Sequence, residues 1–372
     1  MPPSVKKMNK QVLEYKETVE GTIVVVEDKN KSLFGKSTFV NNSAVIGSNY
    51  DAIKAVKMVG HIPLLSSRNC EDVLVIGFGI GVSTSAIAEH NEVDNIDCVE
   101  LVPGLVETAN HYSRFNQKVY KDDRLQMIPG DGRHYLQMTS KKYDLISCDP
   151  THPVLGSGNL YTKEYFSQVH DRLKPEGMVS QYLPLHKLRL QDLQGIIKTF
   201  HSVFPNASVW LGQYHAILIG QKWNGKIDFQ RWKREVNQLP KDDFFYLNPY
   251  HIAANVVLDS KKIQEFPDDI PINTDNLNYT EFFSFDSFDS ENIYQNLKYL
   301  ANHRCEIDDV FKGIDNPQKM MRYKAGNIRL AKSLYHMLRK ERRQALIELK
   351  KATRVNPENQ EYPFLIKFYY GQ

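Results

Sequence analysis

The sequence of 372 residues predicts an α/β protein built around a parallel sheet that binds its ligand at the carboxyl ends of the strands. Four short apolar runs carry this prediction, at residues 73–76, 96–99, 125–128 and 145–148. Each run has the length of a buried strand, and each ends at a glycine turn or a carboxylate. Because the carboxyl ends of parallel strands meet at one edge, we expect these groups to lie together.

The turn after the first run is the most specific of these signals. Residues 77–81 read Gly-Phe-Gly-Ile-Gly, and glycines allow both a tight turn and close approach of the backbone to a ligand. Val82 stands where a dinucleotide fingerprint would have its late glycine. Glu100 follows Gly77 by 23 residues, near the roughly 20-residue spacing at which an acid binds ribose hydroxyls. The spacing alone would also suit NAD.

Two further acids follow the third and fourth runs. Asp131 can accept a hydrogen bond from an adenine amino group, and Asp149 ends the fourth run. Together with Glu100 they predict a nucleoside site. The alternative is an α/β scaffold whose acids are incidental.

Length and composition set the broad class. The chain is long enough for two or three domains, and 41% hydrophobic with 24% charged residues is ordinary for a water-soluble protein. No apolar run reaches the roughly 18 residues of a spanning helix, and we see no signal peptide. The four cysteines form no CxxC pair, so we expect a cytoplasmic protein without disulfides or metal: Cys70, Cys98, Cys148 and Cys305.

The first domain is expected at residues 1–66. Residues 1–20 are polar and are expected to be loosely ordered, followed by a strand at 22–27 and a hairpin of strands 37–40 and 43–46. A helix over 50–59 leads to His61, which is either a helix-end histidine or a residue of the ligand pocket.

The second domain is expected at residues 67–290 and contains the parallel sheet. Beyond Asp149 we expect these elements: a helix at 161–173, a turn at 174–177, a strand at 178–183, a helix at 191–203, a hairpin of 208–211 and 216–220, and a helix at 229–236. A sheet closed by an antiparallel hairpin is typical of nucleoside-dependent transferases.

The third domain, residues 291–372, is expected to be helical and to resemble a tetratricopeptide repeat. Ala345, Ala352 and Pro357 have the spacing of the second helix of such a repeat, and residues 325–337 suit its first. A single repeat must pack on the catalytic domain, a partner or a second subunit. Residues 319–354 carry twelve Lys/Arg against two Glu, which suits a solvated face, an acidic partner or a membrane surface.

From about residue 22 to residue 285 the chain resembles spermidine synthase and its relatives, the polyamine aminopropyltransferases. The resemblance is to the divergent subgroup often fused to a major-facilitator-type membrane segment. The motifs that carry it are GHIPLL, VLVIGFGIG, CVEL, GDGRHYL, YDLISCDPTHP, SGNLYTKEYF and INTDN.

The resemblance implies a Rossmann-like fold of S-adenosylmethionine-dependent transferases and aminopropyl transfer from decarboxylated S-adenosylmethionine to an amine, without a metal. It implies Asp149 as the proton acceptor. The residues implied to bind the cofactor are Gly77, Gly79, Gly81, Glu100, Leu101, Asp131, Gly132 and Gly156. Those implied to hold the acceptor are His61, His152, Tyr161 and Gln181. A homodimer is implied, and no nucleic acid is expected.

Three positions depart from the family pattern. His152 replaces a second catalytic acid, Ile80 replaces the acid that holds the aminopropyl ammonium group, and Ala55 replaces a tyrosine. These losses put putrescine in doubt as the acceptor, and they leave decarboxylated and intact S-adenosylmethionine both open.

Two other functions therefore remain. One is an S-adenosylmethionine-dependent methyltransferase, since a bulky apolar residue inside the glycine turn is ordinary for that class. The other is a catalytically weak nucleoside-binding scaffold that uses its basic C-terminal helices to contact a protein partner. A dehydrogenase has the least support, because no catalytic acid stands at a recognisable place.

Overall fold

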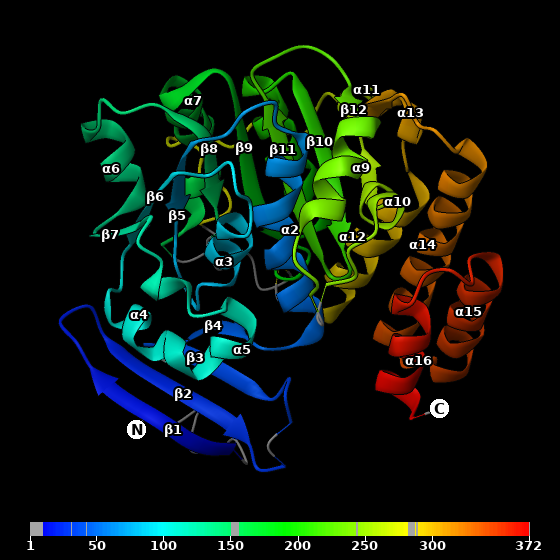
Figure 1. Cartoon of the computed structure of the whole chain (residues 1–372), viewed down its shortest axis with the longest axis horizontal. Coiled ribbons are helices and arrows are strands. Elements are labelled where there is room, and N and C mark those ends of the chain that lie inside the picture. The colour runs from blue at the N-terminus through cyan, green and yellow to red at the C-terminus, as the bar shows by residue number, and fades with distance from the viewer. Residues whose placement is uncertain are drawn as a thin grey trace. The chain divides into compact units, whose positions relative to one another are not determined.

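The computed structural model describes residues 10–30, 32–41, 43–149, 156–242, 245–281, 287 and 289–371 (Figure 1). The chain divides into two compact units. Unit 1 comprises Met1–Thr151 and Ser167–Tyr182, and unit 2 comprises His152–Phe166 and Leu183–Gln372. Each unit is described by itself.

Unit 1 begins with a four-stranded antiparallel sheet, and its first strand corrects the expectation of loose order for residues 10–17, while residues 1–9 lie outside the described residues. The strands follow the order of the chain: β1 (Lys10–Glu17), β2 (Thr22–Asp28), β3 (Lys36–Val40) and β4 (Ser43–Gly47). Pairing of β1 with β2 runs from Lys10 opposite Asp28 to Glu17 opposite Thr22. Strand β1 is polar and only half-buried, so its sequence lacks the apolar alternation that would predict a strand. Its order comes from pairing with β2.

The second sheet of unit 1 is parallel, which confirms the predicted fold class. Its strands lie in the order β9-β8-β5-β6-β7, and each neighbouring pair is parallel. Their bounds are β5 (Asp72–Ile76), β6 (Asn95–Glu100), β7 (Leu125–Pro129), β8 (Tyr143–Cys148) and β9 (Leu173–Pro184). Residues 174–177 were expected to form a turn but lie within β9, where the register with β8 shifts.

Short helices connect these strands. They are α2 (Tyr50–Ser66), α3 (Val82–Ala88), α4 (Gly104–Thr108), η1 (Ala109–Tyr112), α5 (Ser113–Asn116), η2 (Val119–Lys121), α6 (Gly132–Met138) and α7 (Lys163–Arg172). Helix α2 runs past its expected end through Pro63. It packs so closely on α3 that a Cβ atom on Gly60 would lie 2.7 Å from the Ser83 carbonyl oxygen. This packing explains why α2 continues where local sequence favours a stop.

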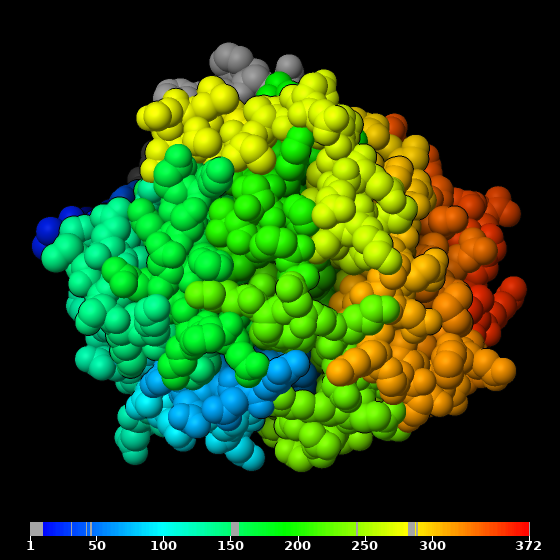
Figure 2. Space-filling model, turned by 90° about the horizontal axis from the view of Figure 1, so that it is seen from above, coloured from blue at the N-terminus to red at the C-terminus, as the bar shows by residue number. Residues whose placement is uncertain are grey.

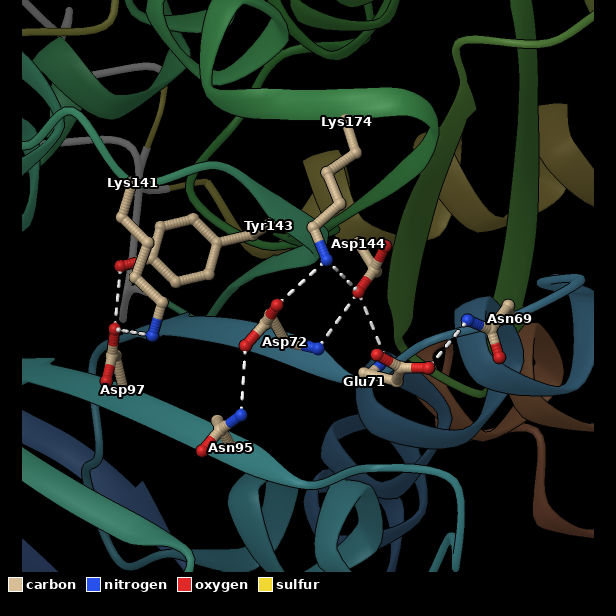
Figure 3. A network of polar contacts seen from close by, with 9 residues as sticks. All are labelled: Asn69, Glu71, Asp72, Asn95, Asp97, Lys141, Tyr143, Asp144 and Lys174. Atoms are coloured by element: carbon tan, nitrogen blue, oxygen red, sulfur yellow. Dashed lines mark hydrogen bonds and ion pairs between the residues drawn. The ribbon is translucent and has the colours of Figure 1, made fainter.

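An ion cluster joins the amino ends of the strands (Figure 3). The Lys174 ammonium group contacts Asp72 at 2.8 Å and Asp144 at 2.7 Å, so one cation links β9, β5 and β8. Beside it, the buried Asp97 carboxylate accepts from Tyr143 at 2.7 Å and from Lys141 at 2.9 Å. These contacts lie at the edge opposite the predicted ligand site.

Unit 2 contains a second, antiparallel set of strands. Strand β10 (Asn206–Gly212) pairs with β11 (His215–Gln221) and with β13 (Val256–Leu258), which confirms the predicted hairpin. The other elements are η3 (Gly158–Tyr161), α8 (Leu190–Val203), β12 (Ile227–Asp228), α9 (Phe229–Gln238), α10 (Pro249–Ala253), α11 (Ser260–Gln264), α12 (Ser290–Asn302), α13 (Ile307–Val310), β14 (Phe311–Lys312), α14 (Pro317–Leu338), α15 (Arg342–Val355) and α16 (Glu361–Tyr370).

The C-terminal helices pack within unit 2 through a buried polar network. His251 of α10 lies 2.8 Å from the carboxylate of Glu361 in α16, and both side chains are buried. The same histidine contacts Asn359 at 2.9 Å, and Tyr362 donates to Asn327 at 2.8 Å. In Figure 2 the orange and red atoms of this segment gather in one continuous region of the visible face. The segment is thus docked on other parts of unit 2, while its likeness to a tetratricopeptide repeat stays a prediction.

Among the described residues, no helix is both long and apolar enough to cross a membrane.

Candidate nucleoside and catalytic site

The carboxyl edge of the parallel sheet brings three of the predicted site segments together. The Gly77 N–H donates to the Val99 carbonyl at 2.9 Å, and the Asp149 N–H donates to the Ile76 carbonyl at 3.0 Å. The Gly130 N–H donates to the Glu100 carbonyl at 3.0 Å. The ends of β5, β6, β7 and β8 therefore form one hydrogen-bonded edge, as the spacing of the apolar runs predicted.

The glycine turn needs glycine for its backbone conformation. Gly77, Gly79 and Gly81 have φ angles of +91°, +56° and +77°, in the region that side chains disfavour. A Cβ atom on Gly77 would also lie 3.1 Å from the Asp149 carbonyl oxygen. The turn thus passes directly beside the predicted catalytic acid.

The Glu100 side chain is buried and organises the glycine turn. One carboxylate oxygen accepts from the N–H of Phe78 at 2.7 Å and of Gly79 at 3.1 Å, and the other accepts from Val102 at 2.8 Å. A carboxylate has roughly four acceptor positions, so one remains for a ligand hydroxyl. Its ribose-binding role stays a prediction, but its structural role was not predicted from sequence.

Asp131 and Gly132 begin helix α6. Asp131 is exposed, and one of its carboxylate oxygens accepts from the His134 N–H at 2.7 Å. A Cβ atom on Gly132 would lie 2.3 Å from a side-chain carbon of Ile76, so only glycine fits there. Leu101, another predicted cofactor contact, is 60% exposed on the same connection as Glu100.

Asp149 is half-buried directly after β8, beside polar residues of β9. Burial raises the pKa of the Tyr182 hydroxyl well above its usual range, and the carboxylates of Asp149 and Asp51 raise it further. Gln181 pairs in register with Cys148 and is fully buried.

The Gln181 amide is one of several buried polar groups without a hydrogen-bond partner among the described residues. Neither its oxygen nor its nitrogen has a hydrogen-bond partner among the described residues. Leaving a buried amide unpaired costs free energy, so a native structure seldom keeps one without a reason. The predicted role of Gln181 in binding the acceptor would supply such a reason, and it stays a prediction.

Two further predicted residues lie in the second compact unit. Tyr161 and Gly156 belong to unit 2, where Tyr161 is buried and Gly156 has a φ of +96°. The N–H groups of Gly156 and Gly158 both donate to the Glu281 carboxylate, which sequence reasoning missed. His152 lies outside the described residues.

His61 lies inside α2 and is fully buried. Its ring contacts the His90 ring at 3.0 Å, and burial, His90 and Lys57 keep the pKa of His61 well below its usual range. His90 follows the carboxyl end of α3, whereas Gly81 precedes its amino end. The predicted role of His61 in binding the acceptor stays a prediction.

Two of the departures from the family pattern are buried. The Ile80 side chain is 1% exposed, and Ala55 is fully buried in α2. The loss of the two contacts expected from sequence stays a prediction. Among the described residues, no cluster of three or more His, Cys, Asp or Glu side chains could hold a metal ion.

A parallel sheet with a glycine turn and acids at its carboxyl edge has the layout of the α/β class that binds a nucleoside-containing ligand at that edge. Residues 54–222 match the family described as the spermine/spermidine synthase domain. The polyamine aminopropyltransferase of Korarchaeum cryptofilum is 30% identical over 242 residues, which cover 62% of this chain and 74% of the relative. The chain belongs to the spermine/spermidine synthase family and is a transferase.

Other relatives agree with this assignment. Spermidine synthase 2 of Arabidopsis thaliana is 30% identical over 152 residues, which cover 41% of this chain and 45% of that protein. The structure of spermidine synthase from Thermotoga maritima matches with a TM-score of 0.50 and 18% identity, over 77% of this chain and 88% of that one. A spermidine synthase in complex with the transition-state analogue AdoDATO matches with a TM-score of 0.51, 18% identity and coverages of 77% and 89%. Both structural likenesses support the fold.

Proposed function

We propose that this chain transfers an aminopropyl group from decarboxylated S-adenosylmethionine to an amine, with Asp149 as the general base. The observation that carries the proposal is the position of Asp149 next to the glycine turn. The Asp149 N–H donates a hydrogen bond to the Ile76 carbonyl, and the Asp149 carbonyl packs against Gly77. The carboxylate takes a proton from the acceptor ammonium group. The freed amine attacks the carbon next to the sulfonium sulfur, the carbon–sulfur bond breaks, and methylthioadenosine leaves.

The hydrogen bonds of the glycine turn favour the decarboxylated cofactor. The N–H groups of Phe78 and Gly79 bind Glu100, and the Gly81 N–H binds the Phe78 carbonyl at 2.8 Å. The Gly77 N–H binds Val99. Because these N–H groups already have acceptors within the protein, few donors of the turn remain to bind the carboxylate of intact S-adenosylmethionine. Glu100, Leu101, Asp131 and Gly132 would hold the nucleoside.

The polar groups beside Asp149 favour an acceptor of modest charge. The Gln181 amide is neutral and can both accept from and donate to an amine acceptor. It adds hydrogen bonds without a second negative charge, so it suits an acceptor that is less cationic than a free diamine, or one whose second charge is met elsewhere. Tyr161, His152, Gly156 and His61 keep the roles that the family resemblance implies.

Calorimetric titration with the two cofactors tests the proposal. We expect the wild-type protein to bind decarboxylated S-adenosylmethionine and methylthioadenosine, with a large preference for the decarboxylated over the intact cofactor. Turnover with a panel of amines, followed by release of methylthioadenosine, then identifies the acceptor. Binding of neither nucleoside would support the scaffold function instead.

A methyltransferase is the second candidate, and Ile80 is the observation that favours it. The family acid at this position is absent, and the Ile80 side chain is buried. A large preference for intact S-adenosylmethionine in the same titration, with transfer of a methyl group, would establish this function and overturn the first.

We also propose the wider organisation that the sequence suggests: an N-terminal unit at residues 1–66, a catalytic domain at 67–290 and a helical segment at 291–372, in a homodimer. The four cysteines are buried and free, which supports a reducing compartment such as the cytoplasm. The basic surface of the last segment is partly neutralised, since Lys319 and Arg322 both pair with Glu358. A protein partner there remains a proposal.

A further inference from the structure

We propose that Asn116 is a positioning residue for the cofactor, because its side chain holds the second half of the glycine turn in the form that binds the nucleoside. This inference rests on the proposed function, since it assigns the nucleoside to that turn. Asn116 belongs to none of the motifs that carry the family resemblance.

The contacts of Asn116 are specific and complete. It is the last residue of α5 and is fully buried. Its side-chain nitrogen donates to the Ile80 carbonyl at 2.7 Å and to the Ala109 carbonyl at 2.9 Å. Its oxygen accepts from the Lys118 N–H at 2.9 Å. One amide thus ties the glycine turn to the helices between β6 and β7.

Glu100 and Asn116 hold the two halves of the turn with opposite polarity. Glu100 accepts from the N–H groups of Phe78 and Gly79, whereas Asn116 donates to the carbonyl of Ile80. Both side chains come from the end of β6 and the connection that follows it. The turn is therefore shaped before any ligand arrives, and preorganisation of this kind improves affinity because binding no longer has to order the backbone.

The backbone after Asn116 is held in an unfavourable conformation. Gln117 and Lys118 have φ angles of +50° and +60°, in the left-handed region that residues other than glycine seldom adopt. Two such residues in succession persist only where the surroundings hold them. The hydrogen bond from Lys118 to Asn116 supplies part of that hold, so Asn116 has both a local contact and a contact to the turn.

Two variants separate the local contact from the contact to the turn. Asn116→Ser keeps an oxygen that can accept from Lys118, as serine does in such turns, but is too short to reach Ile80. Asn116→Ala removes the contacts to Ile80, Ala109 and Lys118 alike. If Asn116 positions the turn, both variants should bind decarboxylated S-adenosylmethionine about tenfold or more weakly, since a buried carbonyl loses its donor. KM for the cofactor should rise by more than kcat falls.

Asn296 provides a matched control. It is equally buried, and its side-chain nitrogen donates to two backbone carbonyls, those of Leu185 and Leu188, at 2.8 Å each. Asn296→Ala should therefore lower the melting temperature by an amount comparable to Asn116→Ala. It should leave cofactor affinity and KM unchanged, because these carbonyls lie outside the glycine turn.

Amide hydrogen exchange of residues 78–81 without any ligand completes the test. Asn116→Ser should speed this exchange well beyond the effect of Asn296→Ala. Wild-type affinity and exchange in Asn116→Ser, with losses only in Asn116→Ala, would assign Asn116 to the local turn and overturn the inference. If the wild-type protein binds neither cofactor, the proposed function fails, while the exchange rates still decide whether Asn116 holds the turn.

Discussion

The two edges of the parallel sheet in unit 1 use carboxylates in opposite ways. At the amino edge, Asp72 and Asp144 share the ammonium group of Lys174 (Figure 3). At the carboxyl edge, Glu100 is bonded to backbone N–H groups of the glycine turn, and Asp131 is bonded to one at the start of α6. The chain therefore places carboxylates at both ends of the strands, with an ammonium group as partner at one end and backbone N–H groups at the other.

The difference lies in the charge that remains. A carboxylate bonded to an ammonium group is neutralised, whereas one bonded to backbone N–H groups keeps its negative charge. The amino edge is therefore a structural cluster, and the carboxyl edge keeps the negative charge that the proposed binding of a sulfonium cofactor and an amine requires. Substitutions at the carboxyl edge should therefore change binding and turnover, whereas substitutions at the amino edge should change stability.

The largest effect is expected from Asp149→Asn at the carboxyl edge. Loss of a general base should lower turnover by about a hundredfold or more, while cofactor affinity stays within about threefold of wild type. The measurement is release of methylthioadenosine with the best amine acceptor. Asp144→Asn, five residues earlier at the amino end of β8, is the control and should keep its turnover. Full activity in Asp149→Asn would remove Asp149 from the mechanism.

Glu100→Ala should give the next largest effect. It removes the acceptor for three backbone N–H groups and for the predicted ribose hydroxyl, so methylthioadenosine should bind about tenfold or more weakly. Calorimetry measures the affinity, and a melting curve shows that the variant is folded. Glu100→Gln keeps one acceptor oxygen, so its affinity for methylthioadenosine should lie between those of the wild type and Glu100→Ala. Unchanged affinity in Glu100→Ala would show that the nucleoside site is elsewhere.

Lys174→Met should act on stability alone. It leaves the carboxylates of Asp72 and Asp144 facing one another without their cation, so the free energy of unfolding should fall by about 1–3 kcal/mol. Urea denaturation measures this loss. Cofactor affinity and turnover should stay at wild-type values, because the change is confined to the amino edge. A loss of affinity with unchanged stability would contradict the division between the edges.

The smallest effect is the dependence of this pairing on pH. The hydrogen bond from Lys174 keeps the pKa of Asp72 below its ordinary value. A carboxylate with a lowered pKa stabilises the folded state above its unfolded pKa, and this contribution is lost as the pH falls through the folded pKa. The stability difference between wild type and Lys174→Met should therefore be full at pH 7 and should shrink below about pH 4. If the stability difference between the two proteins is the same at pH 7 and pH 3, the ion pair between Lys174 and Asp72 contributes nothing to that difference.

Local signals in the sequence were sufficient for the sheet and its ligand edge. Apolar runs of strand length, each closed by glycine or an acid, predicted β5 to β8 and the meeting of Gly77, Glu100 and Asp149. These features depend on residues close together in the chain, because a turn at a strand end needs particular backbone conformations there.

Only the tertiary structure decided the features that depend on distant partners. Strand β1 is ordered by pairing with β2, and α2 continues past its expected end because it packs on α3. His61 is buried against His90. The contacts of Glu100 and Asn116 with the glycine turn follow from which strands and helices become neighbours, as does the lack of a partner for the Gln181 amide among the described residues. A sequence shows the chemistry that each side chain can perform, but hydrogen-bond partners are set by long-range packing, and that packing separates a structural acid from one that can serve a ligand.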